Sequence, residues 1–248
     1  MMLSRQACDV PGALLIWPES AAWPFSYGRD AGLRADVTSL SDSGCSVVLN
    51  SVLESATGIT NSALLVSTSG ETTRYDKRKL VPFGEFVPMA DWLPFMKKLA
   101  RNAGEYAAGR DPALLSWGEQ KIGTAICFEI VFPEAVAEQV RQGATLLVTI
   151  TNDAWYGDTW APWQHYRAAR FRAAENRRTT LRAAITGISA VIAPDGSVQH
   201  RLGVGEEGVL EARVVGRRDL TLFTRAPWLV PFLCCLVGGF AIFDGRRR

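Results

Sequence analysis

Short apolar runs recur along the chain with turn residues between them, which is the pattern of strands in a sheet. Up to residue 151, the runs that predict strands are Ala13–Trp17, Cys45–Leu49, Ala63–Ser67, Thr72–Tyr75, Lys121–Phe128 and Ala144–Thr151. The last two are rich in β-branched residues and nearly continuous, as expected for strands buried on both faces of a sheet. Three further predicted strands are Thr180–Ile185, Ser189–Ala193 and Gly208–Val214.

Segments with helical periodicity lie between some of these strands. Pro133–Gln142 begins with proline and stops before Gly143, which is the usual asymmetry of helix ends. Pro162–Arg178 is a longer amphipathic segment, and Arg29–Leu40 is a weaker helical candidate with irregular periodicity. Strands that alternate with helices, together with hairpins, predict a mixed α/β sheet protein rather than an all-β sandwich.

Composition narrows the class of protein. The 248 residues are 48% hydrophobic and 21% charged, which is enough apolar material for a sizeable core and excludes a disordered tail protein. No linker rich in Pro, Gly or Ser divides the body, so we expect one domain over residues 1–225 with an appendage over 226–248. The net charge of +2 and the lack of a basic run with interleaved aromatics argue against a nucleic-acid partner.

The cysteines and histidines limit the chemistry. The five cysteines are irregularly spaced, so they predict neither a disulfide framework nor a zinc site; they are Cys8, Cys45, Cys127, Cys234 and Cys235. Only His165 and His200 could pair with a catalytic cysteine, and their separation does not suit metal binding. We therefore expect no metal and no cofactor.

The C-terminal segment Ala226–Phe243 carries no charge and is followed by a basic tail that ends at Arg248. Its length is near the short end of the roughly 17–25 apolar residues that a membrane-spanning helix needs. Trp228 has the place of an interfacial aromatic, and the final arginines suit a cytoplasmic flank. The segment predicts a C-terminal transmembrane helix, with a buried soluble helix as the alternative. The N-terminus makes a poor signal peptide.

Residues Val81–Gly109 fit neither the strand nor the helix period and are rich in Pro, Phe, Trp and Met. A long irregular segment of this kind is either a functional lid or binding loop, or an insertion that contains an ordinary helix with a buried face. The sequence leaves both alternatives open.

Four ionisable residues stand at or near predicted strand ends, where α/β proteins place their sites. Glu19 follows Pro18 after the first strand, Lys77 follows a hairpin, Glu85 lies in an apolar turn, and Cys127 ends a buried strand. Each alone is more often structural than catalytic. Together a carboxylate to take the thiol proton, an ammonium to stabilise thiolate and oxyanion, and a thiol nucleophile form a coherent catalytic set without histidine.

Several ordered motifs resemble the carbon-nitrogen hydrolase (nitrilase) superfamily, and within it the membrane-bound branch that acylates bacterial lipoproteins. They are IWPES with Glu19, YDKRKLVPFGEFVP with Lys77 and Glu85, AICFEI with Cys127, and TNDAWYGD over Thr151–Asp158. The resemblance extends from about Gly12 to the C-terminus. It implies an α-β-β-α sandwich in which Glu19 is the general base, Lys77 stabilises the oxyanion and Cys127 is the nucleophile.

The resemblance also implies supporting residues. Glu85 is similar to a second glutamate beside the site, and Phe128 and Glu129 follow the nucleophile. Many relatives have tyrosine at the position of Phe128, so no hydroxyl is expected there, but its backbone N–H remains available to an oxyanion. If Val81–Gly109 is a lid, we expect its apolar side chains to contact lipid; the candidates are Trp92, Phe95 and Met96.

The implied reaction is an acyl transfer in two steps. Cys127 takes an acyl chain from a phospholipid as a thioester and passes it to the α-amino group of the diacylglyceryl-cysteine of a lipoprotein. The implied location is the bacterial inner membrane, with the catalytic domain on the periplasmic face. Relatives carry N-terminal membrane helices and a first strand and helix that have no counterpart here. The alternatives are an amidase acting on a small amide, or an inactive remnant that serves as a structural or interaction module.

Overall fold

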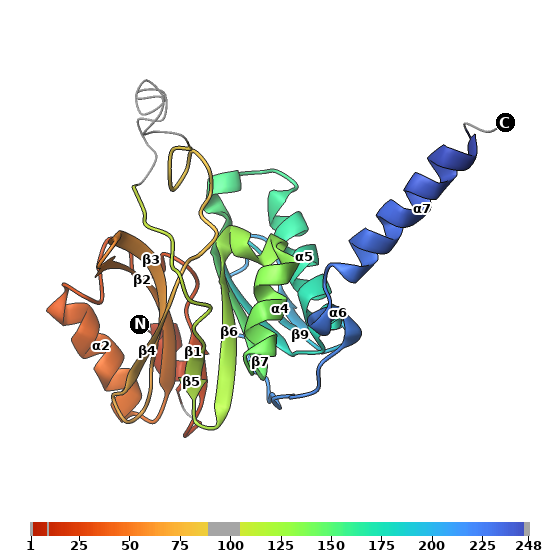
Figure 1. The fold of residues 1–248 in the computed structure, drawn as a ribbon. Helices are drawn as coiled ribbons and strands as arrows, with labels where there is room; N and C mark the ends of the chain where they lie inside the picture. The colour runs from red at the N-terminus through yellow and green to blue at the C-terminus, as the bar shows by residue number, and fades with distance from the viewer. Residues whose placement is uncertain (1, 9, 89–104, 246–248) are drawn as a thin grey trace.

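The computed structural model describes residues 2–8, 10–88 and 105–245, and these form two facing sheets with helices outside them (Figure 1). The first sheet has the order β1-β2-β3-β4. Its strands are β1 (Leu14–Ile16), β2 (Ser46–Ser55), β3 (Gly58–Val66) and β4 (Thr72–Asp76). β1 is parallel to β2, whereas β2, β3 and β4 are joined as antiparallel hairpins, so β1, β2 and β4 all run in the same direction.

The second sheet has the order β10-β9-β8-β7-β6-β5. Its strands are β5 (Leu115–Trp117), β6 (Gln120–Ile126), β7 (Leu146–Asn152), β8 (Thr180–Ile185), β9 (Ser189–Ile192) and β10 (Val198–Leu202). The three central strands β6, β7 and β8 are parallel, and the outer strands are antiparallel to their neighbours. Sequence reasoning missed the short strands β5 and β10.

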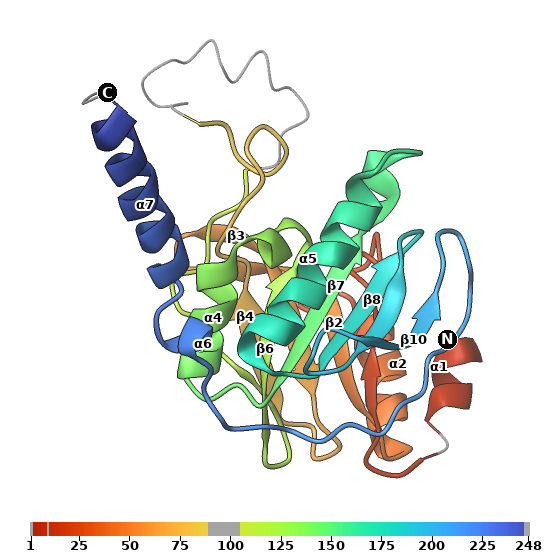
Figure 2. The ribbon, with the colours of Figure 1, turned by 90° about the vertical axis from the view of Figure 1, so that its right-hand side faces the viewer.

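Helices cover the outer faces of both sheets. Helix α2 (Ala31–Asp42) lies against the first sheet, and α4 (Pro133–Arg141) and α5 (Ala161–Asn176) lie on the second (Figures 1 and 2). Asp30 caps α2 by accepting a hydrogen bond from the Leu33 N–H at 2.7 Å. The predicted α-β-β-α sandwich is thus confirmed.

Alternate side chains of β2 pack against the layers on its two faces. Val47 and Leu49 point to the α2 side and join one apolar cluster, whereas Val48 points between the sheets into another. The inter-sheet cluster receives Ile122 and Ile126 from β6. The end of this strand differs from the prediction: β6 stops at Ile126, and Cys127 and Phe128 belong to the short 3-10 helix η1 (Cys127–Val131).

The predicted strand Gly208–Val214 does not form, because no strand pairs with this stretch of the chain. Residues 205–215 instead run along one side of a cavity of about 1230 Å³, whose other sides include β1 and β8. β1 is the edge strand of its sheet, so its outer backbone groups lie beside this cavity. A pattern of alternating residues predicts a strand only where a partner edge is within reach.

The predicted transmembrane helix over Ala226–Phe243 is corrected by the structure, in which the run begins as the cap of one short helix and becomes helical again only at Leu229. Ala226 caps α6 (Leu222–Arg225), and α7 (Leu229–Gly245) starts three residues later and projects from the sandwich (Figures 1 and 2). Among the described residues, no helix is both long enough and apolar enough to cross a membrane.

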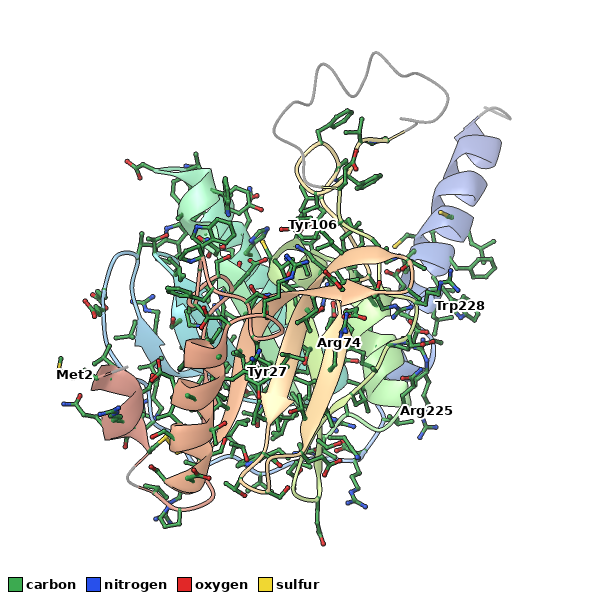
Figure 3. All side chains as sticks on the ribbon, turned by 90° about the vertical axis from the view of Figure 1, so that its left-hand side faces the viewer. Met2, Tyr27, Arg74, Tyr106, Arg225 and Trp228 are labelled. Atoms are coloured by element: carbon green, nitrogen blue, oxygen red, sulfur yellow. A yellow bond between two sulfur atoms is a disulfide. The ribbon has the colours of Figure 1, made fainter. Side chains whose placement is uncertain are left out.

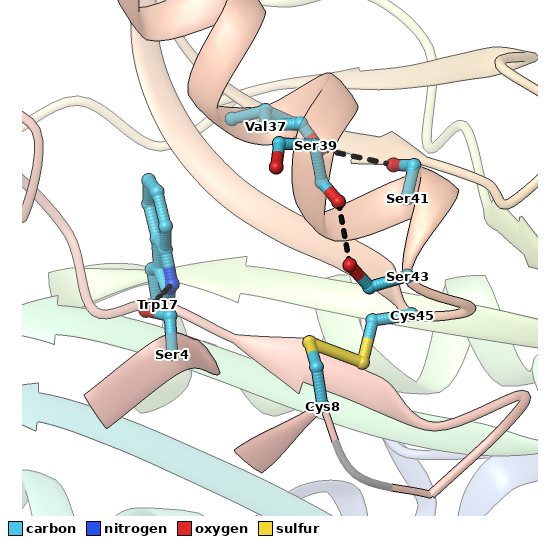
Figure 4. Close-up of a disulfide and its surroundings, with 8 residues drawn as sticks. All are labelled: Ser4, Cys8, Trp17, Val37, Ser39, Ser41, Ser43 and Cys45. Carbon is cyan, nitrogen blue, oxygen red and sulfur yellow. Dashed lines mark hydrogen bonds between the residues drawn. A yellow bond between two sulfur atoms is a disulfide. The ribbon is translucent and has the colours of Figure 1, made fainter. Parts of the chain in front are cut away.

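A disulfide joins Cys8 to Cys45, although the irregular cysteine spacing predicted none (Figure 4). Cys8 follows the short helix α1 (Met2–Ala7), and Cys45 directly precedes β2. The Trp17 indole N–H donates to the Ser4 hydroxyl at 3.0 Å on the same side of the sheet. These two contacts fasten the N-terminal segment to the α2 face of the first sheet.

Candidate active site

The topology brings the three predicted catalytic residues to one end of the molecule. Glu19 follows β1, Lys77 follows β4 and Cys127 follows β6, each at the carboxyl end of its strand. The two sheets are joined there, because the backbone N–H of Asn152 at the end of β7 donates to Glu19 Oε2 at 2.9 Å. All three side chains are buried.

Glu19 is held at both carboxylate oxygens. Its Oε1 accepts a hydrogen bond from Asn61 Nδ2 at 3.0 Å, while Oε2 is bound by the Asn152 N–H. Asn61 is itself positioned, since its Oδ1 accepts from Asn50 Nδ2 at 2.7 Å. Sequence reasoning missed both asparagines, because nothing local marks a strand residue that serves a carboxylate 42 positions away.

Lys77 is almost completely enclosed, with only 1% of its surface exposed. Its Nζ donates to Glu85 Oε1 at 2.7 Å. Burial alone would lower the pKa of Lys77, but surrounding acidic groups outweigh that effect and raise its pKa. These groups are Glu19, Cys127 and Glu85. Lys77 is therefore a fixed positive charge at the site.

Glu85, which the resemblance proposes as a supporting glutamate, lies beside Lys77. Its Oε1 accepts from Lys77 and from Asn61 Nδ2 at 3.2 Å, and its Oε2 accepts from the Val81 N–H at 2.9 Å. Tyr106 donates its backbone N–H to the Glu85 carbonyl at 3.0 Å and lies at this end of the molecule (Figure 3). The proposed lipid-contacting residues lie outside the described residues; they are Trp92, Phe95 and Met96.

Cys127 sits where the chain leaves β6 with a positive φ of 55°. Burial and the Glu19 carboxylate raise the pKa of its thiol, whereas Lys77 and a hydrogen bond with Thr151 lower it; the result is about 11. At neutral pH the sulfur therefore carries its proton, and a base must remove that proton before the sulfur can attack. The carboxylate of Glu19 is in electrostatic contact with it.

Glu129 fixes the turn that carries Cys127. One oxygen accepts from the Ile126 N–H at 2.9 Å, and the other accepts from the N–H groups of Arg78 and Lys79 at 2.7 and 3.0 Å. The Tyr75 hydroxyl donates to the same oxygen at 2.9 Å. One buried carboxylate thus joins the start of η1 to the chain that follows Lys77, and it sets the spacing of thiol and ammonium.

Further groups surround the thiol that sequence reasoning did not assign, although they lie in the TNDAWYGD motif. The Thr151 side chain lowers the pKa of the Cys127 thiol, and burial together with the nearby thiol raises the pKa of Tyr156. The Tyr156 ring packs edge-on against His165 at 5.1 Å, and the Phe128 ring lies 6.2 Å from the same imidazole. Within the described ranges, no group of three or more acidic, cysteine or histidine side chains could hold a metal ion.

Known proteins are similar to this chain in sequence. Residues 3–218 match the model of the carbon-nitrogen hydrolase family. Apolipoprotein N-acyltransferase from Geobacter metallireducens is 42% identical over 86% of this chain and 42% of its own length. The enzyme of the same name from Ralstonia nicotianae is 37% identical over the whole chain and 48% of its own length. The chain thus spans about half the length, or less, of these curated relatives.

Solved structures share the fold. An amidase from Nesterenkonia sp. superposes with a TM-score of 0.59 and 22% identity, over 82% of this chain and 78% of the amidase. Saccharomyces cerevisiae Nit3, a member of the nitrilase superfamily, superposes with a TM-score of 0.58 and 19% identity, over 79% of this chain and 74% of that protein. On its sequence match and its two-sheet architecture, the chain belongs to the carbon-nitrogen hydrolase family.

Proposed function

We propose that this chain carries the catalytic domain of an N-acyltransferase that acylates lipoproteins. The observation that carries the proposal is the buried group of Glu19, Lys77 and Cys127, in a chain whose similar curated proteins are named apolipoprotein N-acyltransferase. The substrates we propose are a phospholipid as acyl donor and the α-amino group of a lipoprotein's diacylglyceryl-cysteine as acceptor.

In the first step, Glu19 takes the proton from the Cys127 sulfur, and the thiolate attacks the carbonyl carbon of the phospholipid ester. Lys77 Nζ and the Phe128 backbone N–H stabilise the oxyanion of the tetrahedral intermediate. As this intermediate collapses, the carbon–oxygen bond breaks, the lysophospholipid alcohol takes the proton from Glu19, and the acyl chain stays on sulfur as a thioester.

In the second step, the free amine of the acceptor attacks the thioester carbonyl, and Glu19 accepts a proton from the attacking nitrogen. The carbon–sulfur bond breaks, an amide forms, and the thiolate recovers the proton from Glu19. Lys77 supports both steps because its charge faces the sulfur and the carboxylates from a buried position. No cofactor takes part in this scheme.

Exposed aromatic side chains support a lipid substrate. Trp23 and Phe25 lie in the loop after β1, Phe83 in the loop after β4, and Trp155 and Trp160 after β7. All five therefore follow strand ends on the same side of the molecule as Cys127, and Trp155 is 84% exposed. Clustered exposed aromatics are typical of surfaces that contact a membrane interface. We propose that this side faces the bilayer.

We further propose that the domain lies on the periplasmic face of the inner membrane. The Cys8–Cys45 disulfide supports this location, because such bonds persist in oxidising compartments and are rare in the cytosol.

Mass spectrometry of the purified chain after incubation with phospholipid vesicles tests the proposal. We expect an acyl adduct on the peptide that contains Cys127, removable by hydroxylamine and absent from Cys127→Ser and Glu19→Gln. Cys234→Ser/Cys235→Ser is the matched control, because it removes the two other free thiols and should leave the adduct unchanged. Hydrolysis of small amides without any acyl adduct would instead favour an amidase. If the protein shows neither activity, the inactive-module alternative is favoured.

A further inference from the structure

A buried ion pair lies behind the reactive thiol and takes no part in the proposed steps. Arg182 on β8 donates from Nη2 to Asp153 Oδ2 at 2.7 Å, and neither side chain is exposed. Arg182 Nε also donates to the Ile188 carbonyl at 2.9 Å, whereas its Nη1 has no partner among the described residues. A Cβ on Gly187 would come within 2.0 Å of Asp153 Oδ2, so the chain closes tightly around this carboxylate.

Stability alone does not explain such a pair. Removing two charges from water has a large desolvation cost, and apolar side chains of similar volume often stabilise a fold equally well or better. The neighbouring Thr149, directly across from Arg182 in the register of β7 and β8, also has an unpartnered hydroxyl. This cluster between the central sheet and α5 therefore carries a desolvation cost that stability does not explain. Its contacts extend toward the candidate active site.

The contacts lead to Cys127 through one hydroxyl group. Thr151 Oγ1 donates to Asp153 Oδ1 at 2.9 Å. The same side chain is near enough to the Cys127 thiol to lower its pKa. A hydroxyl has a single proton, so it cannot donate to the carboxylate and to a thiolate at once. With the thiol protonated, the sulfur can donate to Thr151 while Thr151 donates to Asp153. Once the thiolate forms, the Thr151 proton has to turn to the sulfur.

We propose that Arg182 is a positioning residue for the nucleophile, acting through Asp153 and Thr151. Because the positive charge of Arg182 balances the negative charge of Asp153, the carboxylate is a weaker acceptor for the Thr151 hydroxyl. The hydroxyl can then donate to the thiolate instead. The same pair anchors the start of η2 (Asp153–Tyr156), directly after Asn152, whose N–H holds Glu19. The inference rests on Cys127 as the nucleophile of the proposed function.

The pH dependence of Cys127 alkylation by iodoacetamide tests this without any lipid. The ionisable groups around the thiol are Glu19 after β1, Lys77 after β4, Asp153 and Tyr156 in η2, and Arg182 on β8. His165 of α5 lies behind them, with its Nδ1 3.4 Å from Asp153 Oδ1. In Arg182→Met we expect the alkylation midpoint to rise by about one pH unit, which is about a tenfold slower reaction at pH 8. Arg182→Lys keeps the charge but not the forked geometry, so a smaller rise is expected. Cys234 and Cys235 in the same sample are an internal reference.

Thr151→Val tests whether Arg182 acts on Cys127 through the Thr151 hydroxyl or has only a structural role. If Arg182 acts through the Thr151 hydroxyl, Thr151→Val raises the midpoint on its own, and Arg182→Lys adds little to it in the double variant. Arg178→Met is the matched control: Arg178 is equally buried but donates to the Ala144 carbonyl at 2.8 Å, and it should lower the melting temperature without moving the midpoint.

Fully additive shifts in the Thr151→Val/Arg182→Lys double variant, or wild-type midpoints in folded Arg182 variants, would overturn the inference. If Arg182→Met does not fold, Arg182→Lys and Thr151→Val still decide. A wild-type protein that forms no acyl adduct but shows these shifts would remove the proposed function and leave the thiol relay in place.

Discussion

Two regions of the molecule, the candidate site and the cavity along β1, differ in how their polar groups are satisfied. At the site, the carboxylates of Glu19, Glu85 and Glu129 each accept hydrogen bonds on both oxygens, from elements far apart in the sequence. Along β1 and residues 205–215, by contrast, an edge strand and an unpaired segment border a cavity of about 1230 Å³. The structure of the site therefore depends on a few specific hydrogen bonds. The β1 region depends on the Cys8–Cys45 disulfide and on apolar contacts.

The largest effect is expected at Glu129. Glu129→Ala leaves three backbone N–H groups and the Tyr75 hydroxyl without their acceptor at a buried or partly buried position. Each buried unsatisfied donor costs about 1–3 kcal/mol, so after some relaxation we expect a loss of about 5 kcal/mol in the free energy of unfolding. Urea denaturation followed by circular dichroism measures it.

Glu134→Ala is the matched control for Glu129, since Glu134 is an exposed glutamate in the first turn of α4. Only its interaction with the helix dipole is lost, and about 0.5 kcal/mol is expected. Equal losses of unfolding free energy in the two variants would show that the hydrogen bonds of Glu129 do not hold η1 to the chain after Lys77.

Loss of the Cys8–Cys45 disulfide should destabilise the fold almost as much, without changing the chemistry of the site. Cys8 and Cys45 are 37 residues apart, and closing a loop of that length stabilises a fold by about 3–4 kcal/mol through the entropy of the unfolded chain. We expect Cys8→Ala/Cys45→Ala to lose this amount while Cys127 keeps its wild-type alkylation profile. Adding dithiothreitol should destabilise the wild type and leave the double variant unchanged. A changed Cys127 profile would mean that the two regions are coupled.

A pair of identical truncations compares the packing of the two regions directly. Val148 of β7 is fully buried between the sheets, whereas Val214 is partly buried against the same cluster and borders the cavity. Val148→Ala should lower the unfolding free energy by about 2–3 kcal/mol, and Val214→Ala by less than about 1 kcal/mol. Thermal melts of both variants test this. Similar losses would show that residues 205–215 are packed as tightly as the core.

The sequence could predict residues that are marked by a local signal, but not those whose roles depend on contacts distant in the sequence. Strand ends, helix ends and the residues Glu19, Lys77, Glu85 and Cys127 were within reach, because each follows an apolar run or a turn signal beside it. Asn61 and Asp153 were not assigned, since their roles arise from contacts across 42 and 29 positions. The strand predicted at Gly208–Val214 was wrong because alternation cannot reveal whether a partner edge exists. Irregular spacing likewise concealed the Cys8–Cys45 pair, which depends on where α1 returns to the sheet.

The smallest expected effect is a shift in the titration of Cys127. Burial first, and then the Glu19 carboxylate, raise the pKa of this thiol from about 9 to about 11. Because the folded state resists formation of the thiolate, the protein should lose stability as the pH rises from 9 to 11. Glu19→Gln removes the negative charge, so the alkylation midpoint should fall by about one pH unit, and alkylation at pH 8 should become about tenfold faster.

Glu19→Gln is informative because its two consequences oppose each other. A variant whose thiol reacts faster with iodoacetamide, yet forms no acyl adduct, has lost the base that accepts and returns the proton while retaining an accessible sulfur. Glu134→Gln, which changes an exposed carboxylate, should leave both measurements at wild-type values. If Glu19→Gln slows alkylation, the carboxylate holds the sulfur in position rather than opposing its ionisation, and the electrostatic account of this site is wrong.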